Sequence, residues 1–268
     1  MQRDHFEFGK NWQRFLKFVN EKRIETAKDS LLKFLALDNL KRKSFLDVGC
    51  GSGIFSYGAF LAGVKEVISF DIDKFSVRCC RYFYERAGRP SNWHIYEGSI
   101  LDEGFISKLP RFDIVYAWGV LHHTGNMWQA LKNTATLVKE DGLLYLAIYN
   151  KKDGPFGSFF WLKIKRFYNR SPEAIKYIMQ IVFIISYIIF LLLKLNNPIK
   201  RVANYGQKRG MVFLTDVRDW LGGLPYEFAN PSEVINFLAS DFELVKIKLT
   251  KRTGNNEYLF RKKRKKNL

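Results

Sequence analysis

The most informative part of the sequence is the run Phe45-Leu46-Asp47-Val48-Gly49-Cys50-Gly51-Ser52-Gly53-Ile54. It has the pattern of an apolar strand, a glycine-rich turn and the start of a helix, which we predict over Ile54–Leu61. Glycines let the backbone turn sharply and let a ligand lie against it, with the helix N-terminus behind that ligand. The run therefore predicts a ligand-binding turn at the carboxyl end of a strand.

The spacing of the glycines and acids narrows the class of ligand. A nicotinamide-binding turn has a third glycine where this chain has Ile54. Asp47 stands two residues before the first glycine, where a negative charge suits a cationic ligand and gives nothing to a pyrophosphate. Asp71 follows Gly53 by eighteen residues, at the end of a second predicted strand, and is placed there to accept both hydroxyls of a ribose.

Short apolar runs alternate with helical or turn segments along most of the chain, which is the pattern of a parallel α/β sheet. Two helices are expected between Asn11 and Leu37, and another over Pro231–Ser240. We predict strands at Ser44–Val48, Glu66–Phe70, Trp93–Tyr96, Phe112–Ala117 and Leu143–Tyr149, and a closing antiparallel hairpin from Phe242–Leu249 and Glu257–Phe260.

Five segments follow from this pattern. They are N-terminal helices (1–43), an α/β core (44–150), a helical insertion (151–209), the C-terminal part of the same fold (210–260) and a basic tail (261–268).

The chain has 268 residues, 47% of them hydrophobic, which is enough for a sizeable core and excludes a disordered tail. Its three cysteines form neither a disulfide framework nor zinc-binding pairs, so we expect a reducing compartment and no metal site. The N-terminus lacks the pattern of a signal peptide, which favours a cytoplasmic protein.

The net charge of +18 is concentrated in two places. Between Lys151 and Arg209 there are 12 basic and 2 acidic residues, and every position from Arg261 to Lys266 is basic. Such clusters favour an anionic partner, whether a membrane surface, a phosphate-bearing substrate or a nucleic acid. Solvated charge that only increases solubility is the alternative.

The insertion also contains 17 consecutive uncharged residues, 177–193, which is at the short limit for crossing a bilayer. A single crossing of the bilayer is disfavoured, because it would put the two ends of the insertion on opposite sides of the membrane. The strands predicted after the insertion must join the same sheet as the strands before it. Two interpretations remain open: a helix in the membrane interface, and a lid or dimer helix packed on protein. Basic residues flank the run, namely Lys163, Lys165, Arg166 and Arg170 before it and Lys200, Arg201, Lys208 and Arg209 after it.

The ordered set of motifs resembles the class I S-adenosylmethionine-dependent methyltransferases. The glycine run, the acid Asp71 and Phe112-Asp113-Ile114-Val115-Tyr116 as strand four occur in the order and with the gaps of that family. The resemblance implies a Rossmann-like seven-stranded sheet, the cofactor S-adenosylmethionine and its product S-adenosylhomocysteine. It implies that these residues bind the cofactor: Asp47, Gly49, Cys50, Gly51, Gly53, Asp71, Ile72, Ser99, Ile100 and Trp118.

The choice of residues beside adenine stays open at the end of the third strand. Many relatives have an acid directly after the glycine of Glu97-Gly98, where this chain has Ser99. Asp102 is the nearest acid in the sequence that follows. It is either an adenine neighbour or the cap of a helix over Glu103–Leu109.

The residues after strand four should face the transferable methyl group, because ligands of open α/β sheets bind beyond the carboxyl ends of the strands. They are Ala117-Trp118-Gly119-Val120-Leu121-His122-His123-Thr124, and they lack the Asn/Asp-Pro-Pro-aromatic turn of enzymes that methylate base amines. A histidine can take the proton of an attacking hydroxyl. The stretch is similar to the ubiquinone-biosynthesis type of O-methyltransferase, which implies that His123 is the base or substrate orienter. His122 is the second candidate, with packing or helix capping as its alternative.

Other segments resemble a bacterial branch of these methyltransferases that is associated with surface-polysaccharide and other glycan pathways. They are Phe8-Gly9-Lys10-Asn11-Trp12, Arg209-Gly210-Met211, the run from Asp219 to Glu227, and Asn255-Asn256-Glu257-Tyr258. The resemblance implies a sugar, a phosphorylated metabolite or a lipid-linked saccharide as methyl acceptor. Four residues are candidates for the acceptor pocket, with core packing as their alternative: Trp12, Trp220, Tyr226 and Glu227.

We therefore predict O-methylation of such an acceptor by a cytoplasmic enzyme. A peripheral position on the inner membrane face stays open, and it follows if the apolar helix lies in the membrane interface. A homodimer is a further partner that we keep open. RNA methylation is one alternative, favoured by the basic charge and opposed by the missing amine-methylation turn. The other alternative is a non-catalytic, membrane-associated scaffold that retains the methyltransferase fold.

Overall fold

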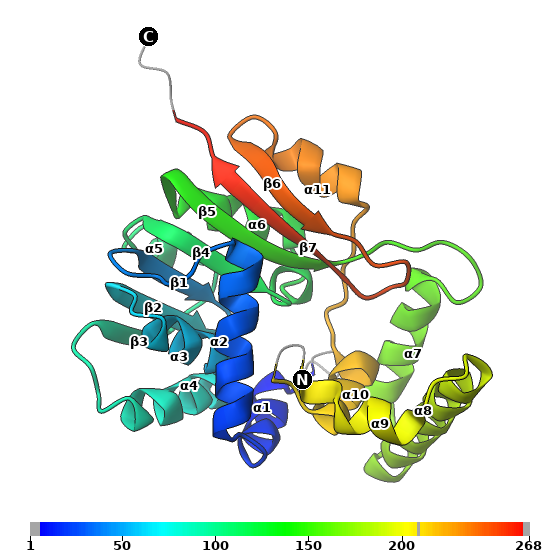
Figure 1. Ribbon diagram of the computed structural model, residues 1–268. Helices are drawn as coiled ribbons and strands as arrows, with labels where there is room; N and C mark the ends of the chain where they lie inside the picture. Colours follow the sequence, from blue (N-terminus) through cyan, green and yellow to red (C-terminus); the bar gives the residue numbers. More distant parts are fainter. Residues whose placement is uncertain (1–5, 208–209, 265–268) are drawn as a thin grey trace.

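The computed structural model describes residues 6–207 and 210–264. Seven strands form one sheet in the order β3-β2-β1-β4-β5-β7-β6. The first five strands are parallel, and β7 runs antiparallel to both of its neighbours (Figure 1). The strands are β1 (Ser44–Val48), β2 (Glu66–Asp71), β3 (Trp93–Glu97), β4 (Phe112–Trp118), β5 (Val138–Tyr149), β6 (Phe242–Lys248) and β7 (Asn255–Lys262).

Helices cover both faces of the sheet, as expected where central parallel strands are apolar on both sides. Side chains of α2, α3 and α4 pack on one face, and those of α5, α6 and α11 pack on the other. The α-helices are α1 (Phe8–Leu16), α2 (Glu21–Leu35), α3 (Ile54–Leu61), α4 (Lys74–Arg86), α5 (Glu103–Ile106), α6 (Met127–Thr136), α7 (Ser158–Arg170), α8 (Glu173–Leu193), α9 (Pro198–Ala203), α10 (Phe213–Gly222) and α11 (Pro231–Leu238). Two short 3₁₀ helices are η1 (Leu121–His123) and η2 (Tyr205–Gln207).

The strand order reverses between β1 and β4. From β1 the chain proceeds outward to β2 and β3, and then returns to the other side of β1 as β4. The loops that leave the carboxyl ends of β1 and β4 therefore diverge and leave a crevice between them. This crevice lies beside the glycine turn.

Helix α1 is attached to two other helices across the crevice. The Gly9 N–H donates to Asp73 Oδ2 at 2.8 Å, and a Cβ at Gly9 would lie 2.5 Å from that oxygen. The Asn11 side chain donates to the Thr215 carbonyl on α10 at 2.9 Å. The opening motif Phe8-Gly9-Lys10-Asn11-Trp12 is thus explained by docking: glycine allows the close approach to α4, and asparagine bonds to α10.

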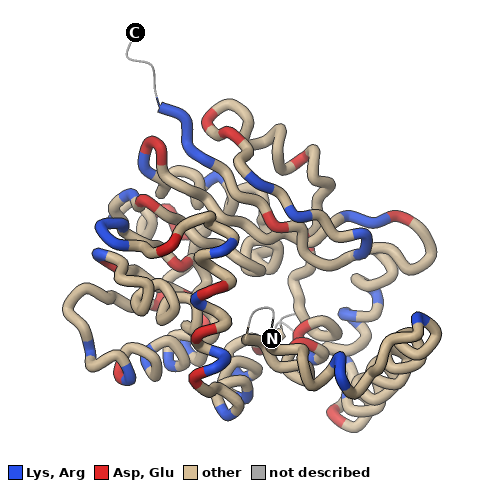
Figure 2. Tube along the Cα trace, in the orientation of Figure 1, with Lys and Arg blue, Asp and Glu red and all other residues tan. Residues whose placement is uncertain are grey.

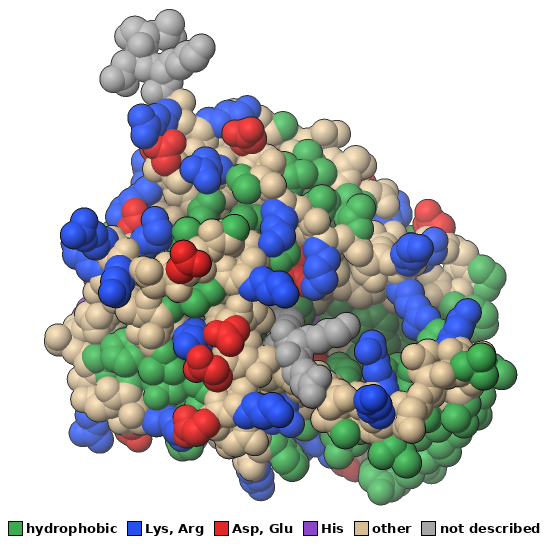
Figure 3. Space-filling view, in the orientation of Figure 1, with side chains coloured by type: hydrophobic (Ala, Val, Ile, Leu, Met, Phe, Trp, Pro, Cys, Tyr) green, Lys and Arg blue, Asp and Glu red, His purple; other side chains and the backbone are tan. Residues whose placement is uncertain are grey.

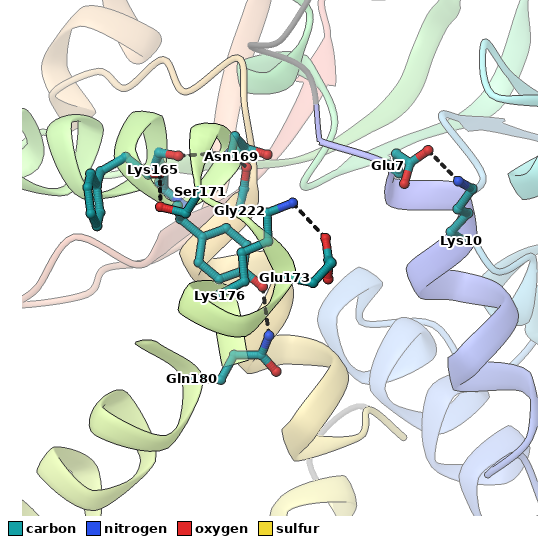
Figure 4. Close-up of polar contacts among 11 residues, drawn as sticks. Glu7, Lys10, Lys165, Asn169, Ser171, Glu173, Lys176, Gln180 and Gly222 are labelled. Atoms are coloured by element: carbon teal, nitrogen blue, oxygen red, sulfur yellow. Dashed lines mark hydrogen bonds and ion pairs between the residues drawn. The ribbon is translucent and has the colours of Figure 1, made fainter. Parts of the chain in front are cut away.

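The segment 151–209 contains α7, α8 and α9, which extend to one side below the strand ends (Figure 1). Polar side chains fasten the α7–α8 hairpin to itself and to α10 (Figure 4). The Asn169 amide donates to the Gly222 carbonyl at 2.6 Å, and the Gln180 amide donates to the Tyr168 hydroxyl at 2.8 Å. At the start of α8, Lys176 pairs with Glu173 at 2.8 Å.

The predicted seven-stranded, mostly parallel sheet with a C-terminal hairpin is confirmed. Several predicted boundaries were wrong. Strand β5 begins at Val138 rather than Leu143, and the helix predicted over Glu103–Leu109 ends at Ile106. Arg261 and Lys262 belong to β7 and not to a tail, while 265–268 lie outside the described residues.

The last glycine of the turn provides a stability test with a matched control. Gly53 has φ +80°, and a Cβ there would lie 2.5 Å from the Cys80 Cα of α4. Gly88 has φ +82° with open space around it, so an alanine there would clash with no neighbouring atom. Gly88→Ala therefore measures only the cost of a left-handed backbone conformation, about 1–2 kcal/mol. We expect Gly53→Ala to lower the free energy of unfolding in urea by about 1–3 kcal/mol more than Gly88→Ala, because the backbone of α4 must also move. Equal losses would contradict this close packing.

Candidate active site

A cavity of about 680 Å³ opens at the carboxyl ends of β1, β2, β3 and β4. The loops after these strands form one wall. Helices α1, α8, α9 and α10 contribute the opposite wall, through residues that include Phe8, Phe183, Arg201 and Trp220. A volume of this size suits a ligand pocket, and the two walls come from distant parts of the sequence.

The glycine turn has backbone positions that side chains would block. Gly49 has φ +66°, and a Cβ there would lie 2.2 Å from Val120 Cγ2. Gly51 has φ +54°, and a Cβ there would lie 2.8 Å from Trp12 Nε1. Gly49, Cys50 and Gly51 line the cavity, whereas Gly53 is not among its lining residues and packs on α4. Gly53 thus has a packing role, and its cofactor contact stays a prediction.

Asp47 is buried in the cavity wall and held by a chain of hydrogen bonds. Trp93 Nε1 donates to Ser69 Oγ at 3.0 Å, Ser69 Oγ donates to Ser56 Oγ at 2.7 Å, and Ser56 Oγ donates to Asp47 Oδ2 at 2.5 Å. Burial raises the pKa of Asp47 to about 7. A cationic ligand in the cavity would favour the ionised form of this carboxyl group.

Asp71 lines the cavity at the carboxyl end of β2. Its Oδ2 accepts the Gly51 N–H at 2.9 Å, and its Oδ1 accepts the Asp73 N–H at 2.9 Å. These bonds fix the carboxyl plane against the glycine turn. Each oxygen keeps capacity for a second donor, as binding of two ribose hydroxyls requires. Burial raises the pKa of Asp71 to about 6.

The remaining cofactor candidates also surround this half of the cavity. Ile72, Ser99, Ile100 and Trp118 all line it. Asp102 does not, and its side chain instead accepts the Phe105 N–H at 3.2 Å as the N-cap of α5. Of the two interpretations of Asp102, the structure supports the helix cap.

His123 lines the cavity on η1, directly after β4. Its Nδ1 lies 2.5 Å from the Pro225 carbonyl oxygen, which can only accept a hydrogen bond. Nδ1 therefore carries the proton, and in the neutral ring Nε2 is the basic nitrogen. The Phe8 ring packs on one side with centroids 4.7 Å apart, and a Cβ at Gly223 would lie 2.9 Å from His123 Cε1.

These contacts account for much of the run from Asp219 to Glu227. Gly223 leaves room for the His123 ring, and the Pro225 carbonyl orients it. Trp220 lines the cavity, as predicted, together with Trp12. Tyr226 and Glu227 are not among the residues that line this cavity, so their place in the acceptor pocket stays a prediction. Glu227 accepts the Met127 N–H at 3.1 Å and thereby caps α6, while Tyr226 is buried against Tyr149.

His122 is fully buried and lies in the same cavity wall. Burial lowers its pKa well below the usual range, so the ring is neutral. Its Nδ1 accepts the Tyr149 N–H at 3.3 Å, which leaves the proton on Nε2. Within the described residues this Nε2 has no hydrogen-bond partner, and the same holds for Asp219 Oδ1 and Asn255 Oδ1 in the same wall. Three buried polar atoms are therefore available to a ligand.

A buried lysine lies behind this wall. Lys165 of α7 donates to the Trp220 carbonyl, and its Nζ lies 4.9 Å from the Trp220 ring and 4.8 Å from the Tyr226 ring. Burial lowers the pKa of Lys165 and raises that of Asp219, while their opposite charges favour the ionised pair. Lys165 was counted among the cationic flanks of the insertion, yet it contributes no surface charge.

Sequence reasoning missed several lining residues, among them Phe8, Tyr149, Phe183, Tyr187, Asp219 and Asn255. Asp219 and Asn255 stood inside the segments that resembled the glycan-pathway branch, which was a signal that could have identified them. No sequence motif identifies Tyr149 or Phe183 as cavity residues. Tyr149 ends β5 and Phe183 lies in α8, and only the fold brings both to the cavity.

The methyltransferase domain family matches residues 19–237, and the chain therefore belongs to that family. The chain is 28% identical over 143 residues to the ubiquinone biosynthesis O-methyltransferase of Methylobacterium nodulans. The matched region covers 52% of this chain and 55% of that protein. It thus spans about half the length of the curated relatives it matches.

Two solved structures share the fold. The magnesium protoporphyrin IX methyltransferase of Synechocystis, with bound S-adenosylhomocysteine, is 14% identical with a TM-score of 0.52, over 89% of this chain and 82% of that one. The N-methyltransferase NodS of Bradyrhizobium japonicum, in complex with S-adenosylhomocysteine, is 14% identical with a TM-score of 0.50, over 96% and 99% of the two chains. The chain thus belongs to the family of S-adenosylmethionine-dependent methyltransferases and has their Rossmann-like fold.

The residues of the cavity fit this cofactor. The side-chain-free turn at Gly49 and Gly51 leaves space against the backbone, and Asp71 presents a fixed carboxyl group for the ribose. Asp47 adds a buried carboxyl group that a positive charge would ionise.

We expect Asp71→Ala to abolish micromolar binding of S-adenosylhomocysteine in calorimetric titration. Asp102→Ala, which removes only the α5 cap, should leave that affinity unchanged, and an equal loss in both variants would contradict the assignment.

The raised pKa values of Asp47 and Asp71 predict a pH dependence of cofactor binding. A bound cation favours the ionised carboxyl groups, so protons leave on binding and affinity rises with pH, by up to about tenfold per pH unit for each proton released. S-adenosylmethionine carries a sulfonium charge that S-adenosylhomocysteine lacks. We expect its affinity relative to S-adenosylhomocysteine to increase between about pH 6 and about pH 8. Titrations of the wild type and Asp47→Asn check this, and an equal increase in the variant would show that Asp47 is not responsible.

Proposed function

We propose that this methyltransferase transfers a methyl group to a hydroxyl of a small-molecule, sugar or lipid-linked saccharide acceptor. The observation that carries the proposal is the hydrogen bond from His123 Nδ1 to the Pro225 carbonyl. It makes Nε2 the basic nitrogen of a histidine in the cavity wall, as deprotonation of a hydroxyl requires.

S-adenosylmethionine supplies a methyl group on a positively charged sulfur, which becomes a neutral thioether once the methyl is lost. His123 Nε2 takes the proton that the acceptor hydroxyl gives up as its oxygen gains the methyl group. The resulting imidazolium is stabilised by the Pro225 carbonyl at Nδ1. The Phe8 ring and Gly223 restrict the movement of His123, which supports its proposed role as the base.

The polar atoms around His123 support an acceptor with several hydroxyl groups. His122 Nε2 offers a buried hydrogen to an acceptor oxygen, and Asp219 Oδ1 and Asn255 Oδ1 can each accept a hydroxyl hydrogen. Unpartnered buried polar atoms are costly, so a ligand that bonds to them gains affinity over one that cannot. Trp12 and Trp220 add flat apolar surface, which suits the faces of sugar rings. The similarity to ubiquinone biosynthesis O-methyltransferases also favours oxygen as the methylated atom.

The acceptor is found by supplying methyl-labelled S-adenosylmethionine with nucleotide sugars, phosphorylated metabolites, polyprenyl-linked glycans and RNA. We expect label in a hydroxyl-bearing acceptor of the first three classes. Label in RNA alone, or in an amine, would overturn the proposal.

With that acceptor, we expect His123→Ala and His123→Gln to lower kcat by at least about a hundredfold, the lower range for general base catalysis. The affinity for S-adenosylhomocysteine should stay unchanged, because the cofactor half of the cavity is intact. Asn126→Ala, on the exposed surface of the same loop, serves as the control. Near-normal turnover of both His123 variants would remove this residue from the reaction.

A further inference from the structure

The outward face of α8 is a continuous apolar surface. Five aliphatic side chains on this face are between 50% and 56% exposed, and they follow one another at helical spacing: Ile178, Val182, Ile185, Ile189 and Leu192. Isolated apolar residues are common on protein surfaces, but an uninterrupted row along a helix is not. We call this row, with Tyr177, Ile181 and Leu193, the outer face of α8.

The apolar surface extends beyond α8. Leu195 is 97% exposed and Ile199 is 82% exposed in the segment that follows, and Phe159 and Phe167 are exposed on α7. Apolar side chains gather over this part of the molecule at the lower right of Figure 3. Among the described residues, Glu173–Leu193 is the one helix long and apolar enough, by length and composition, to cross a membrane.

The inward face of α8 packs on other helices of the protein. Phe183 contacts Trp161 with ring centroids 6.1 Å apart, and Tyr187 contacts Phe213 of α10 at 5.5 Å. Gln180 bonds to Tyr168 and accepts from Arg218 Nε at 3.3 Å. A helix with these contacts cannot be surrounded by lipid, so it does not cross a bilayer alone. It can lie in the plane of a membrane interface with one face in the lipid.

The charges around the outer face identify its partner. Between Lys151 and Gln207 the only acidic residues are Asp153 and Glu173, and Glu173 already pairs with Lys176. The exposed cations of this segment are Lys163, Arg166, Lys194, Lys200 and Arg201. Figure 2 shows basic positions along the α7–α9 part of the chain. In a symmetric dimer the same cationic border of a second copy would meet this one with few acids to compensate. An anionic bilayer complements both the apolar face and its border.

The same helix is a wall of the active-site cavity. Phe183 and Tyr187 line the cavity from the inner face of α8, and Arg201 and Asn204 line it from α9 and the residue that follows. Only the thickness of one helix therefore separates the cavity from the outer face. Arg201 is exposed and also lines the cavity, so it lies at the cavity mouth beside α8.

We propose that the outer face of α8 docks on an anionic lipid bilayer, and that the methyl acceptor is a membrane-borne amphiphile that enters the cavity beside α8 and α9. Its apolar part stays in the bilayer while its hydroxyl-bearing head reaches His123. A phosphate in the head would meet Arg201 at the mouth. This proposal rests on the proposed function for the chemistry at His123, but the docking itself does not.

Docking is tested by flotation of the full chain with phosphatidylcholine vesicles and with vesicles that also contain phosphatidylglycerol. We expect flotation with the anionic vesicles, loss of flotation at high salt, and loss in the double variant Ile185→Glu, Ile189→Glu. The matched control is Val245→Glu, Leu249→Glu, which places the same charges at 47% and 59% exposed apolar residues in and after β6. The control should float like the wild type.

Three outcomes would overturn docking: no flotation with anionic vesicles, equal flotation of the α8 variant, or a dimer in sedimentation that this variant dissociates. The second copy would then be the partner of the outer face. S-adenosylhomocysteine titration of the variant, expected unchanged, shows that it is folded.

The acceptor class is tested by incubating the protein with labelled S-adenosylmethionine and bacterial membrane vesicles or an aqueous metabolite extract. We expect label in the lipid phase for the wild type and at least about a tenfold loss for the α8 variant, because its concentration at the membrane falls. Label only in a water-soluble hydroxyl compound would overturn the membrane-borne acceptor and leave O-methylation standing. Label in neither fraction, with docking intact, would count against the proposed function instead.

Discussion

The site depends on the absence of side chains at Gly49 and Gly51. At each position a neighbouring side chain occupies the space that a Cβ would need, Val120 at Gly49 and Trp12 at Gly51. Val120 belongs to the loop that carries both histidines, and Trp12 belongs to α1. The turn is therefore the common support of the loop with the two histidines and of the helix that covers the cavity. Its backbone also holds Asp71 in place through the Gly51 N–H.

The sheet and the cofactor half of the cavity could be predicted because their signals are local. Each strand is a short apolar run, and Asp47, Gly49, Gly51 and Asp71 lie at strand ends whose positions follow from those runs. The acceptor half could not be predicted in the same way. Its walls come from α1, α8, α10 and β7, and only the folded chain brings Phe8, Asp219 and Asn255 to one cavity.

The errors have a related cause. Tyr226 and Glu227 are close to Trp220 in sequence, but Trp220 is the last residue of this run that lines the cavity. Pro225 and Glu227 instead hold His123 and α6. Lys165 was counted with the surface cations because composition gives no information on burial, and it is enclosed by Trp220, Tyr226 and Tyr149. The sequence leaves open whether 177–193 lies in a membrane interface or packs on protein. In the structure one face of α8 lines the cavity, and no described residue covers the other.

Helix α1 links the two halves of the cavity mechanically. It is a nine-residue helix that bonds to Asp73 beside the cofactor half and to Thr215 on the helix that carries Asp219. A displacement of α1 that uncovers the glycine turn also withdraws Phe8 from His123. Access to the glycine turn past α1 is therefore coupled to the packing of His123, because the helix that covers the turn also carries the Phe8 ring.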